Sequence, residues 1–221
     1  MSENYKCKEV IEPKTGTVHR FYTYKGKPCR RVPLNSRLCK QLAGYALIEK
    51  DLRSVGIWLK EIDALRGDEA MPKGHIRSPD RKTYNVIKGL FVAALTFYGK
   101  CFSKCEGRPV KLERSQMTDK YRQVHDDFIK LRHNFAAHSG NEGIEHVQIA
   151  VVIPRAKKHD VSPTLYRELL QPDLVLAKDD IKLIELIEHA QDITKRKIDL
   201  LHHKILNEEV YPLGREHWLK V

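Results

Sequence analysis

The fold is decided by residues 35–67, which read NSRLCKQLAGYALIEKDLRSVGIWLKEIDALRG. Apolar side chains return every three or four residues along this stretch, a spacing that places them on one face of a helix. Asn35 and Ser36 suit a helix N-cap, and Gly67 suits a helix end. The stretch therefore predicts one long helix. Its apolar stripe comprises Leu38, Leu42, Tyr45, Leu52, Val55, Leu59 and Ile62.

Three later segments show the same helical spacing, which makes the predicted fold class mainly α with four long helices. Ser78-Pro79-Asp80 combine a cap, a first-turn proline and an acid, and these suit the free N–H groups and positive dipole of a helix start. Asp179 and Asp180 place negative charge at another start. The later helices are predicted at about 78–107, from Ser115 or Thr118 to about 140, and at about 179–210.

An N-terminal arm is predicted ahead of the first helix. Residues 17–24 are rich in β-branched and aromatic side chains, and they end at the turn sequence Lys25-Gly26-Lys27-Pro28. We therefore expect a short β arm or hairpin within residues 1–34.

A second pair of strands is predicted within the helical region. Apolar side chains alternate with others in residues 147–153, and a second extended piece at 165–176 is interrupted by Pro172. Proline has no N–H to donate, so the second piece is expected at an edge or a bulge. The helical domain is thus predicted over 35–221, with a small two-stranded β insertion at 145–176.

Composition limits the class of protein and its partners. The 221 residues are 41% hydrophobic, and no stretch approaches the 18 consecutive apolar residues of a membrane span. The first ten residues are polar and mixed in charge, so a secretory signal is not indicated, and we expect a cytoplasmic protein with no membrane partner. A formal net charge of +11 favours a polyanionic partner such as RNA, DNA or an acidic protein.

Motifs of several enzyme classes are missing from the sequence. It has no Gly-rich phosphate loop, nucleophile elbow, HExxH or CxxC motif, so kinase, P-loop and α/β-hydrolase functions are unsupported. The five cysteines are an odd number at scattered spacings, which indicates reduced thiols. Cys101 and Cys105 offer half a metal site, with His189 or His202-His203 as the remainder, but packed thiols are the favoured interpretation and no metal or cofactor is predicted.

The end of the third predicted helix carries the candidate site. Residues 130–140 read KLRHNFAAHSG, and at about 100° per residue Arg132 and His138 both border the apolar stripe of this helix. Asn134 is predicted one helical turn before His138, where a side-chain contact would orient the imidazole. The partial negative charge of the helix end favours the protonated form of His138.

A simpler interpretation of these residues stays open. A histidine followed by Ser-Gly is a common arrangement at a helix C-terminus, which gives His138 the role of a cap. Arg132 then packs its stem along apolar surface or pairs with an acid such as Asp127 or Glu142.

The string Arg132-x5-His138, with polar His133 directly after the arginine and an Ala-His pair before the helix stop, resembles the R-x4-6-H motif of the HEPN superfamily. The predicted helix order is also similar to that family's antiparallel bundle, in which the motif ends the third helix. The resemblance covers approximately residues 35–210. The inserted strands and the N-terminal extension depart from the simplest HEPN pattern, although inserted strands are similar to those of some abortive-infection branches.

The resemblance implies a metal-independent endoribonuclease, active as a homodimer and serving as a toxin or defence effector. Attack of a ribose 2′-OH on its own 3′-phosphate needs a base, an acid and a cation. Two copies of His138 would supply the base and the acid, Arg132 would clamp the phosphate, and Asn134 and His133 would support them. The alternatives are a non-catalytic HEPN-like module that binds RNA, a nucleotide or a partner such as an antitoxin nucleotidyltransferase, and a purely structural scaffold.

Two runs of basic residues are further candidates for RNA binding, although such runs are usually solvated faces. Tyr22 and Tyr24 lie near the first run and are candidates for stacking on bases or for packing the hairpin. The basic candidates are Lys25, Lys27, Arg30, Arg31, Lys195, Arg196 and Lys197.

Overall fold

The computed structural model describes residues 4–66, 81–133, 146–155, 162–170 and 180–221. The chain divides into two compact units. The terminal unit comprises residues 1–40 and 200–221, and the central unit comprises residues 41–199. The predicted arm, residues 1–34, therefore falls in a unit that also contains the C-terminal residues.

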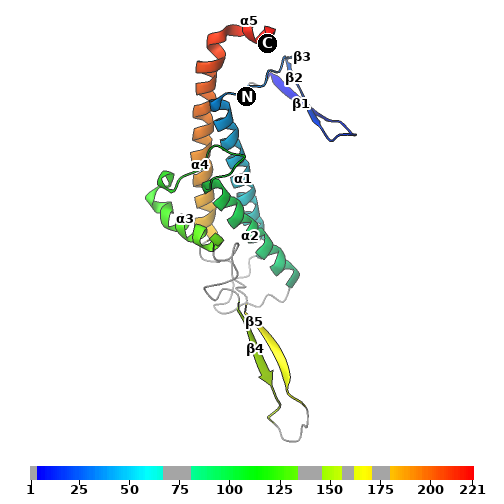
Figure 1. The fold of residues 1–221 in the computed structure, drawn as a ribbon, viewed down its shortest axis with the longest axis vertical. Helices are drawn as coiled ribbons and strands as arrows, with labels where there is room; N and C mark the ends of the chain where they lie inside the picture. Colours follow the sequence, from blue (N-terminus) through cyan, green and yellow to red (C-terminus); the bar gives the residue numbers. More distant parts are fainter. Residues whose placement is uncertain (1–3, 67–80, 134–145, 156–161, 171–179) are drawn as a thin grey trace. The chain divides into compact units, whose positions relative to one another are not determined.

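The described chain is mainly α-helical with two small antiparallel sheets, which confirms the predicted class (Figure 1). None of its described helices is long and apolar enough to cross a membrane. The helices are α1 (Arg37–Arg66), α2 (Arg81–Phe102), α3 (Asp119–Leu131), α4 (Asp180–Ile205) and α5 (Gly214–Lys220). The strands are β1 (Tyr5–Ile11), β2 (Val18–Tyr24), β3 (Lys27–Pro28), β4 (His146–Val152) and β5 (Thr164–Leu170).

The core of the central unit is formed by one face from each of α1, α2, α3 and α4. On α1 the buried positions follow the helical period, so the predicted stripe is confirmed over its second half and gains Ile48. Large buried side chains from the other helices and from the segment between α2 and α3 complete this core. Its main members are Ile48, Leu52, Val55, Leu59, Ile62, Phe91, Leu95, Tyr98, Leu112, Met117, Phe128, Leu186 and Ile187.

A close approach of the chain to α1 explains one glycine of the central unit. A Cβ at Gly44 would lie 2.6 Å from Val110 Cγ2 and 3.2 Å from Arg108 Cγ. Glycine therefore lets the segment between α2 and α3 pack directly on the α1 backbone.

The terminal unit contains a three-stranded antiparallel sheet in the order β1-β2-β3. Lys25 and Gly26 join β2 to β3, and both have positive φ angles, of 47° and 77°. That geometry is typical of the tight hairpin turn that matches strand twist. Strand β1 was not predicted, because its recognition depends on pairing with β2 from Tyr5↔Tyr24 to Ile11↔Val18.

The C-terminal part of the terminal unit contains a helix that the sequence analysis did not predict. The chain stays helical to Val210, as predicted, through a π-helical turn at Leu206–Val210 that follows α4. A 3₁₀ turn at Tyr211–Leu213 follows, with a proline in its first turn, and α5 then begins at Gly214 with a φ of 69°. Proline and a left-handed glycine together end the long helix and start a new one.

The β insertion is an antiparallel hairpin of β4 and β5, whose register pairs Val147 with Leu169 and Val151 with Leu165. The predicted first strand is confirmed, and the second is described up to Leu170. Pro172 lies outside the described residues. The large apolar side chains that the structure describes in the hairpin are exposed, from 45% for Val152 to 68% for Leu165.

Candidate functional site

Arg132 and His133 follow α3 directly and continue it as a π-helical turn. The N–H of Arg132 donates to the carbonyl oxygens of Phe128 and Ile129. The start of the predicted third helix is confirmed, because Thr118 is the N-cap with extended backbone at φ −68° and ψ 157°. Single π-helical turns inside α-helices are often found at functional sites.

The side chain of Arg132 lies directly against Gly99 of α2. A Cβ at position 99 would overlap Arg132 Cδ and would lie 2.7 Å from Nε. The absence of a side chain at Gly99 therefore creates the channel in which the arginine stem lies.

Arg132 and His133 line a pocket of about 300 Å³ between the end of α2 and α3. The volume is at the small end of the range for ligand sites, and suits a group of phosphate size with part of its neighbour. The remaining lining residues are Gly99, Phe102, Ser103, Leu112, Glu113, Arg114, His125 and Ile129.

Two charged residues of this pocket have partners of opposite charge. Arg114 donates twice to the carboxylate of Asp126, over 2.6 Å in each case, and this hydrogen bonding holds the pKa of Asp126 below its usual value. Glu113 Oε1 lies 3.2 Å from Lys111 Nζ. Both charges are therefore compensated.

Arg132 has a different electrostatic setting. Within the described part of the chain, no carboxylate forms an ion pair with it; Asp127 instead accepts from Gln123 Nε2 over 3.0 Å. The alternative pairing with Asp127 is thus not found, and Glu142 lies outside the described residues. A half-buried guanidinium without a described counter-charge, next to the exposed imidazole of His133, is suited to binding an anion.

His125 is a pocket residue that the sequence analysis missed. The residue is 4% exposed, its ring contacts the rings of Phe102 and Tyr98, and it shares a hydrogen bond of 2.7 Å between Nδ1 and Tyr98 Oη. Burial lowers the pKa of His125 and raises that of Tyr98, so both groups are neutral at pH 7. The available signal was its position seven residues before Arg132, which places the two on one helix face.

The structure brings together only part of the predicted site. Arg132 and His133 share the pocket, whereas Asn134 and His138 lie outside the described residues. His133, predicted as a supporting residue, is the exposed imidazole beside the arginine.

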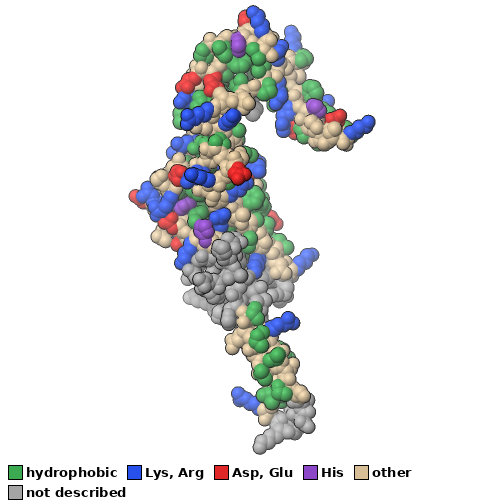
Figure 2. Space-filling view, in the orientation of Figure 1, with side chains coloured by type: hydrophobic (Ala, Val, Ile, Leu, Met, Phe, Trp, Pro, Cys, Tyr) green, Lys and Arg blue, Asp and Glu red, His purple; other side chains and the backbone are tan. Residues whose placement is uncertain are grey.

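The basic candidates are distributed over both units. Lys27 and Arg30 line a groove of the terminal unit, Lys25 Nζ lies 5.6 Å from the Tyr24 ring centroid, and Arg31 is exposed outside this groove. Lys195, Arg196 and Lys197 lie on α4, where Arg196 donates to the carbonyl of Asp192. On the face shown in Figure 2, Lys and Arg are scattered among acidic and apolar side chains, so net charge alone does not identify a site.

All five cysteines are free thiols. Cys101 is buried and donates to the Phe97 carbonyl, and burial raises its pKa to about 12, which keeps it protonated. Among the described residues, no group of three or more His, Cys, Asp or Glu side chains is arranged to hold a metal ion.

The fold and the pocket define the chain as a mainly helical protein with an arginine site at the end of its third helix. Comparisons with protein-family models, with curated proteins and with solved structures find no match to this chain.

Proposed function

We propose that this protein is a HEPN-like endoribonuclease that cleaves RNA by attack of a ribose 2′-OH on the adjacent 3′-phosphate. The observation that carries the proposal is the position of Arg132: its guanidinium enters a pocket beside an imidazole and has no described carboxylate partner. An arginine without a counter-charge suits the phosphoryl oxygens, on which negative charge grows during the reaction.

In the proposed reaction, Arg132 binds the scissile phosphate through its planar fork of N–H donors. The 2′-oxygen forms a bond to phosphorus as its proton passes to a neutral imidazole, and the bond to the 5′-oxygen breaks as that oxygen takes a proton from an imidazolium. The products are a 2′,3′-cyclic phosphate and a free 5′-hydroxyl. We assign the proton transfers to His138, with Asn134 and His133 in support, in a homodimer that brings two copies of the motif to one cleft.

The test of this proposal uses a single-stranded RNA and the same strand with a 2′-deoxy substitution at the cleaved position. Purified protein should cut the RNA in EDTA, leave 2′,3′-cyclic phosphate ends, and spare the deoxy-substituted site. Cleavage of the deoxy site at a similar rate would overturn the proposed nucleophile. Cleavage that EDTA abolishes and a divalent ion restores would overturn the proposed proton-transfer mechanism.

An outcome of RNA binding without cleavage would favour the alternative of a non-catalytic binding module. Arg132→Ala separates the two functions, because it should abolish cleavage in the first case and only weaken binding in the second. A protein partner such as an antitoxin nucleotidyltransferase would then be the next ligand to test.

A further inference from the structure

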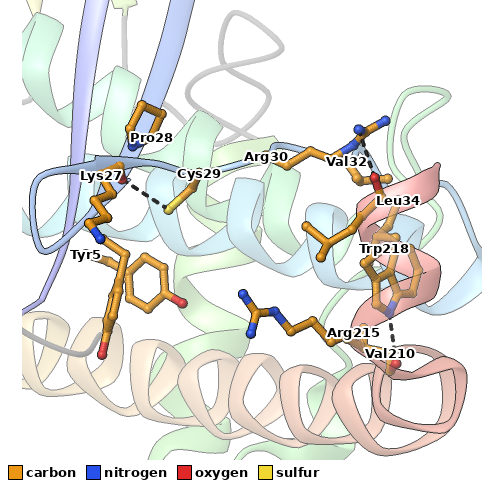
Figure 3. Close-up of a pocket in the computed structure, with 12 residues that line it drawn as sticks. Tyr5, Lys27, Pro28, Cys29, Arg30, Val32, Leu34, Val210, Arg215 and Trp218 are labelled. Atoms are coloured by element: carbon orange, nitrogen blue, oxygen red, sulfur yellow. Dashed lines mark hydrogen bonds between the residues drawn. The ribbon is translucent and has the colours of Figure 1, made fainter.

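The terminal unit contains a second feature with binding chemistry, an open groove of about 770 Å³ (Figure 3). One wall comes from the sheet and the segment that follows it, and the other comes from α5 and the turn before it. Two hydrogen bonds stabilise the second wall and join it to the first: Arg30 Nη1 donates to the Leu219 carbonyl over 3.0 Å, and Trp218 Nε1 donates to the Val210 carbonyl over 3.0 Å.

The sheet side of the groove presents two aromatic rings to solvent. Tyr5 and Tyr24 are cross-strand partners, with ring centroids 4.8 Å apart and planes inclined by 48°. They remain 56% and 39% exposed, although packing in a sheet usually hides much of a tyrosine ring. Exposed flat rings at a groove wall suit stacking by another planar group.

The helix side adds a third aromatic residue. The indole of Trp218 is half-buried, and its bond to Val210 uses the only polar atom of the ring. The remaining surface of the indole is therefore available for apolar contact alone, in a fixed orientation.

The charges that line the groove are all positive. Lys27, Arg30 and Arg215 contribute to its walls, and no Asp or Glu does. Figure 3 shows the Arg215 side chain extending across the groove toward Tyr5 and Lys27. In the described part of the terminal unit none of the three forms an ion pair, so an anionic group would supply the missing counter-charge.

We propose that this groove binds single-stranded RNA, with bases stacked on Tyr5 and on Tyr24 and the neighbouring phosphate held by Arg215 and Lys27. Stacking rings beside cations match the alternation of base and phosphate along a single strand. An acidic peptide would satisfy the cations but would leave the exposed rings without planar partners. The groove uses none of the residues assigned to cleavage, so this proposal is independent of the proposed enzyme activity.

The test measures the affinity of a fluorescein-labelled 2′-O-methyl oligo(U) decamer for the Arg132→Ala protein. Neither the protein variant nor an RNA strand whose 2′-oxygens are methylated permits cleavage, so binding is measured whether or not the chain is a ribonuclease. Tyr24→Leu and Arg215→Ala should each weaken binding by about tenfold, since one stacked base or one charged contact is typically worth this much. Arg215→Ala should also reduce the slope of log affinity against log salt by about one.

Two matched variants control for charge and for loss of a tyrosine. Arg37→Ala removes an exposed arginine of the same unit that does not line the groove, and Tyr211→Leu removes a tyrosine of this unit that is 64% exposed. Both should bind within about twofold of the parent protein. Equal losses in the groove variants and these controls would overturn the assignment to the groove.

A fluorescence measurement keeps the test decisive even where a groove variant fails to fold. Trp58 and Trp218 are the two tryptophans, so Trp58→Phe leaves Trp218 as the sole reporter in an otherwise native groove. Its emission should change on addition of the decamer and saturate at the affinity seen by the label. An unchanged emission at saturation would show that the strand binds elsewhere.

Competition experiments distinguish a single strand from a free nucleotide, because both ligands present a base beside a phosphate. Uridine monophosphate should displace the decamer only at concentrations at least about tenfold higher, because it offers one base and one phosphate. Inorganic phosphate should be weaker still. If the monophosphate binds as tightly as the decamer, the ligand is a free nucleotide and the RNA assignment is wrong.

Discussion

Two arginines lie against consecutive residues of α2, and the comparison between their sites shows how the fold separates a charge that has a buried partner from a charge that has no described partner. Arg108 is 6% exposed, donates to the Lys100 carbonyl and has its Nη1 atom 3.6 Å from Asp51 Oδ2. Arg132 lies on Gly99, in an open pocket, without a described carboxylate partner. A buried charge with a partner of opposite charge contributes to packing. A charge without such a partner at a pocket is available to bind a ligand.

The site of Arg108 is a buried cluster with Asp51 at its centre. Asp51 is 1% exposed, with Oδ2 3.1 Å from Lys100 Nζ, and it connects α1 to the end of α2 and to the following turn. Burial of these charges costs desolvation free energy. Removal of one partner leaves another charge buried without compensation, so we expect it to destabilise the fold strongly.

The largest predicted effect is therefore on stability, for Asp51→Asn. The variant leaves the buried Arg108 guanidinium without its carboxylate, and the free energy of unfolding should fall by about 3–5 kcal/mol in urea titrations. Asp63→Asn removes an exposed carboxylate from the same helix, and should change it by no more than about 0.5 kcal/mol. Equal stability of the two variants would show that the buried cluster is not a structural centre.

The second prediction concerns Arg132, where a substitution should reduce activity and leave stability nearly unchanged. Arg132→Ala and His138→Ala should each reduce the rate of RNA cleavage by at least about 100-fold, with melting temperatures close to that of the parent. Arg132→Lys should recover only part of the rate, because lysine keeps the charge but lacks the planar fork.

Arg53→Ala serves as the matched control for these variants. Arg53 is 60% exposed on α1 and pairs with Glu49, so its removal should leave the cleavage rate unchanged. Near-normal turnover of Arg132→Ala in protein free of contaminating nuclease would remove Arg132 from the site.

The third prediction concerns the channel that Gly99 provides. Gly99→Ala should lower the cleavage rate by roughly tenfold, because the new Cβ displaces the flexible Arg132 stem from its position. The fold itself should gain stability, by up to about 1 kcal/mol, because alanine is the better helix former.

Gly89→Ala is the matched control on the same helix, since no atom of the described residues beyond the neighbouring helix backbone lies within 4 Å of the Cβ that it adds. It should give a similar gain in stability with no change in rate. A lower rate in both variants would assign the effect to the rigidity of α2 instead of the position of Arg132.

Local patterns predicted the helices well because a helical period is a property of neighbouring residues. Leu52, Val55, Leu59 and Ile62 were predicted on one face of α1 and are buried there. The strand β1 was missed, since all its residues are exposed and its pairing partner lies on another strand. The specific bundle and the homodimer stay predictions.

The candidate site shows the same division between local and distant information. The sequence indicated Arg132 from its place at a helix end, but its setting depends on Gly99, which lies on another helix. Likewise, the groove of the terminal unit joins Tyr5 to Trp218 from opposite ends of the chain. Contacts between residues that are distant in the sequence depend on tertiary packing, and the hydrophobic periodicity of a single segment does not predict them.

The smallest predicted effect tests whether the buried wall of the Arg132 pocket contributes only to stability, as we expect of the Arg108 cluster. Burial lowers the pKa of His125 in the folded state, so below about pH 6.5 the unfolded chain binds the extra proton more readily. The stability contributed by neutral His125 is thus complete above that pH and is lost as the pH falls toward the lowered pKa. His125→Gln should flatten this part of the pH dependence of unfolding.

The measurement compares the free energy of unfolding at about pH 7.5 and pH 5 for the parent, His125→Gln and His203→Gln. His203 is exposed on α4 and provides the matched loss of a histidine. A stability loss on acidification that is identical in the parent and His125→Gln would contradict the burial argument. Loss of RNA cleavage by a stably folded His125→Gln would instead make the buried imidazole part of the reaction, and the pocket wall would then differ from the Arg108 cluster in function as well as in charge.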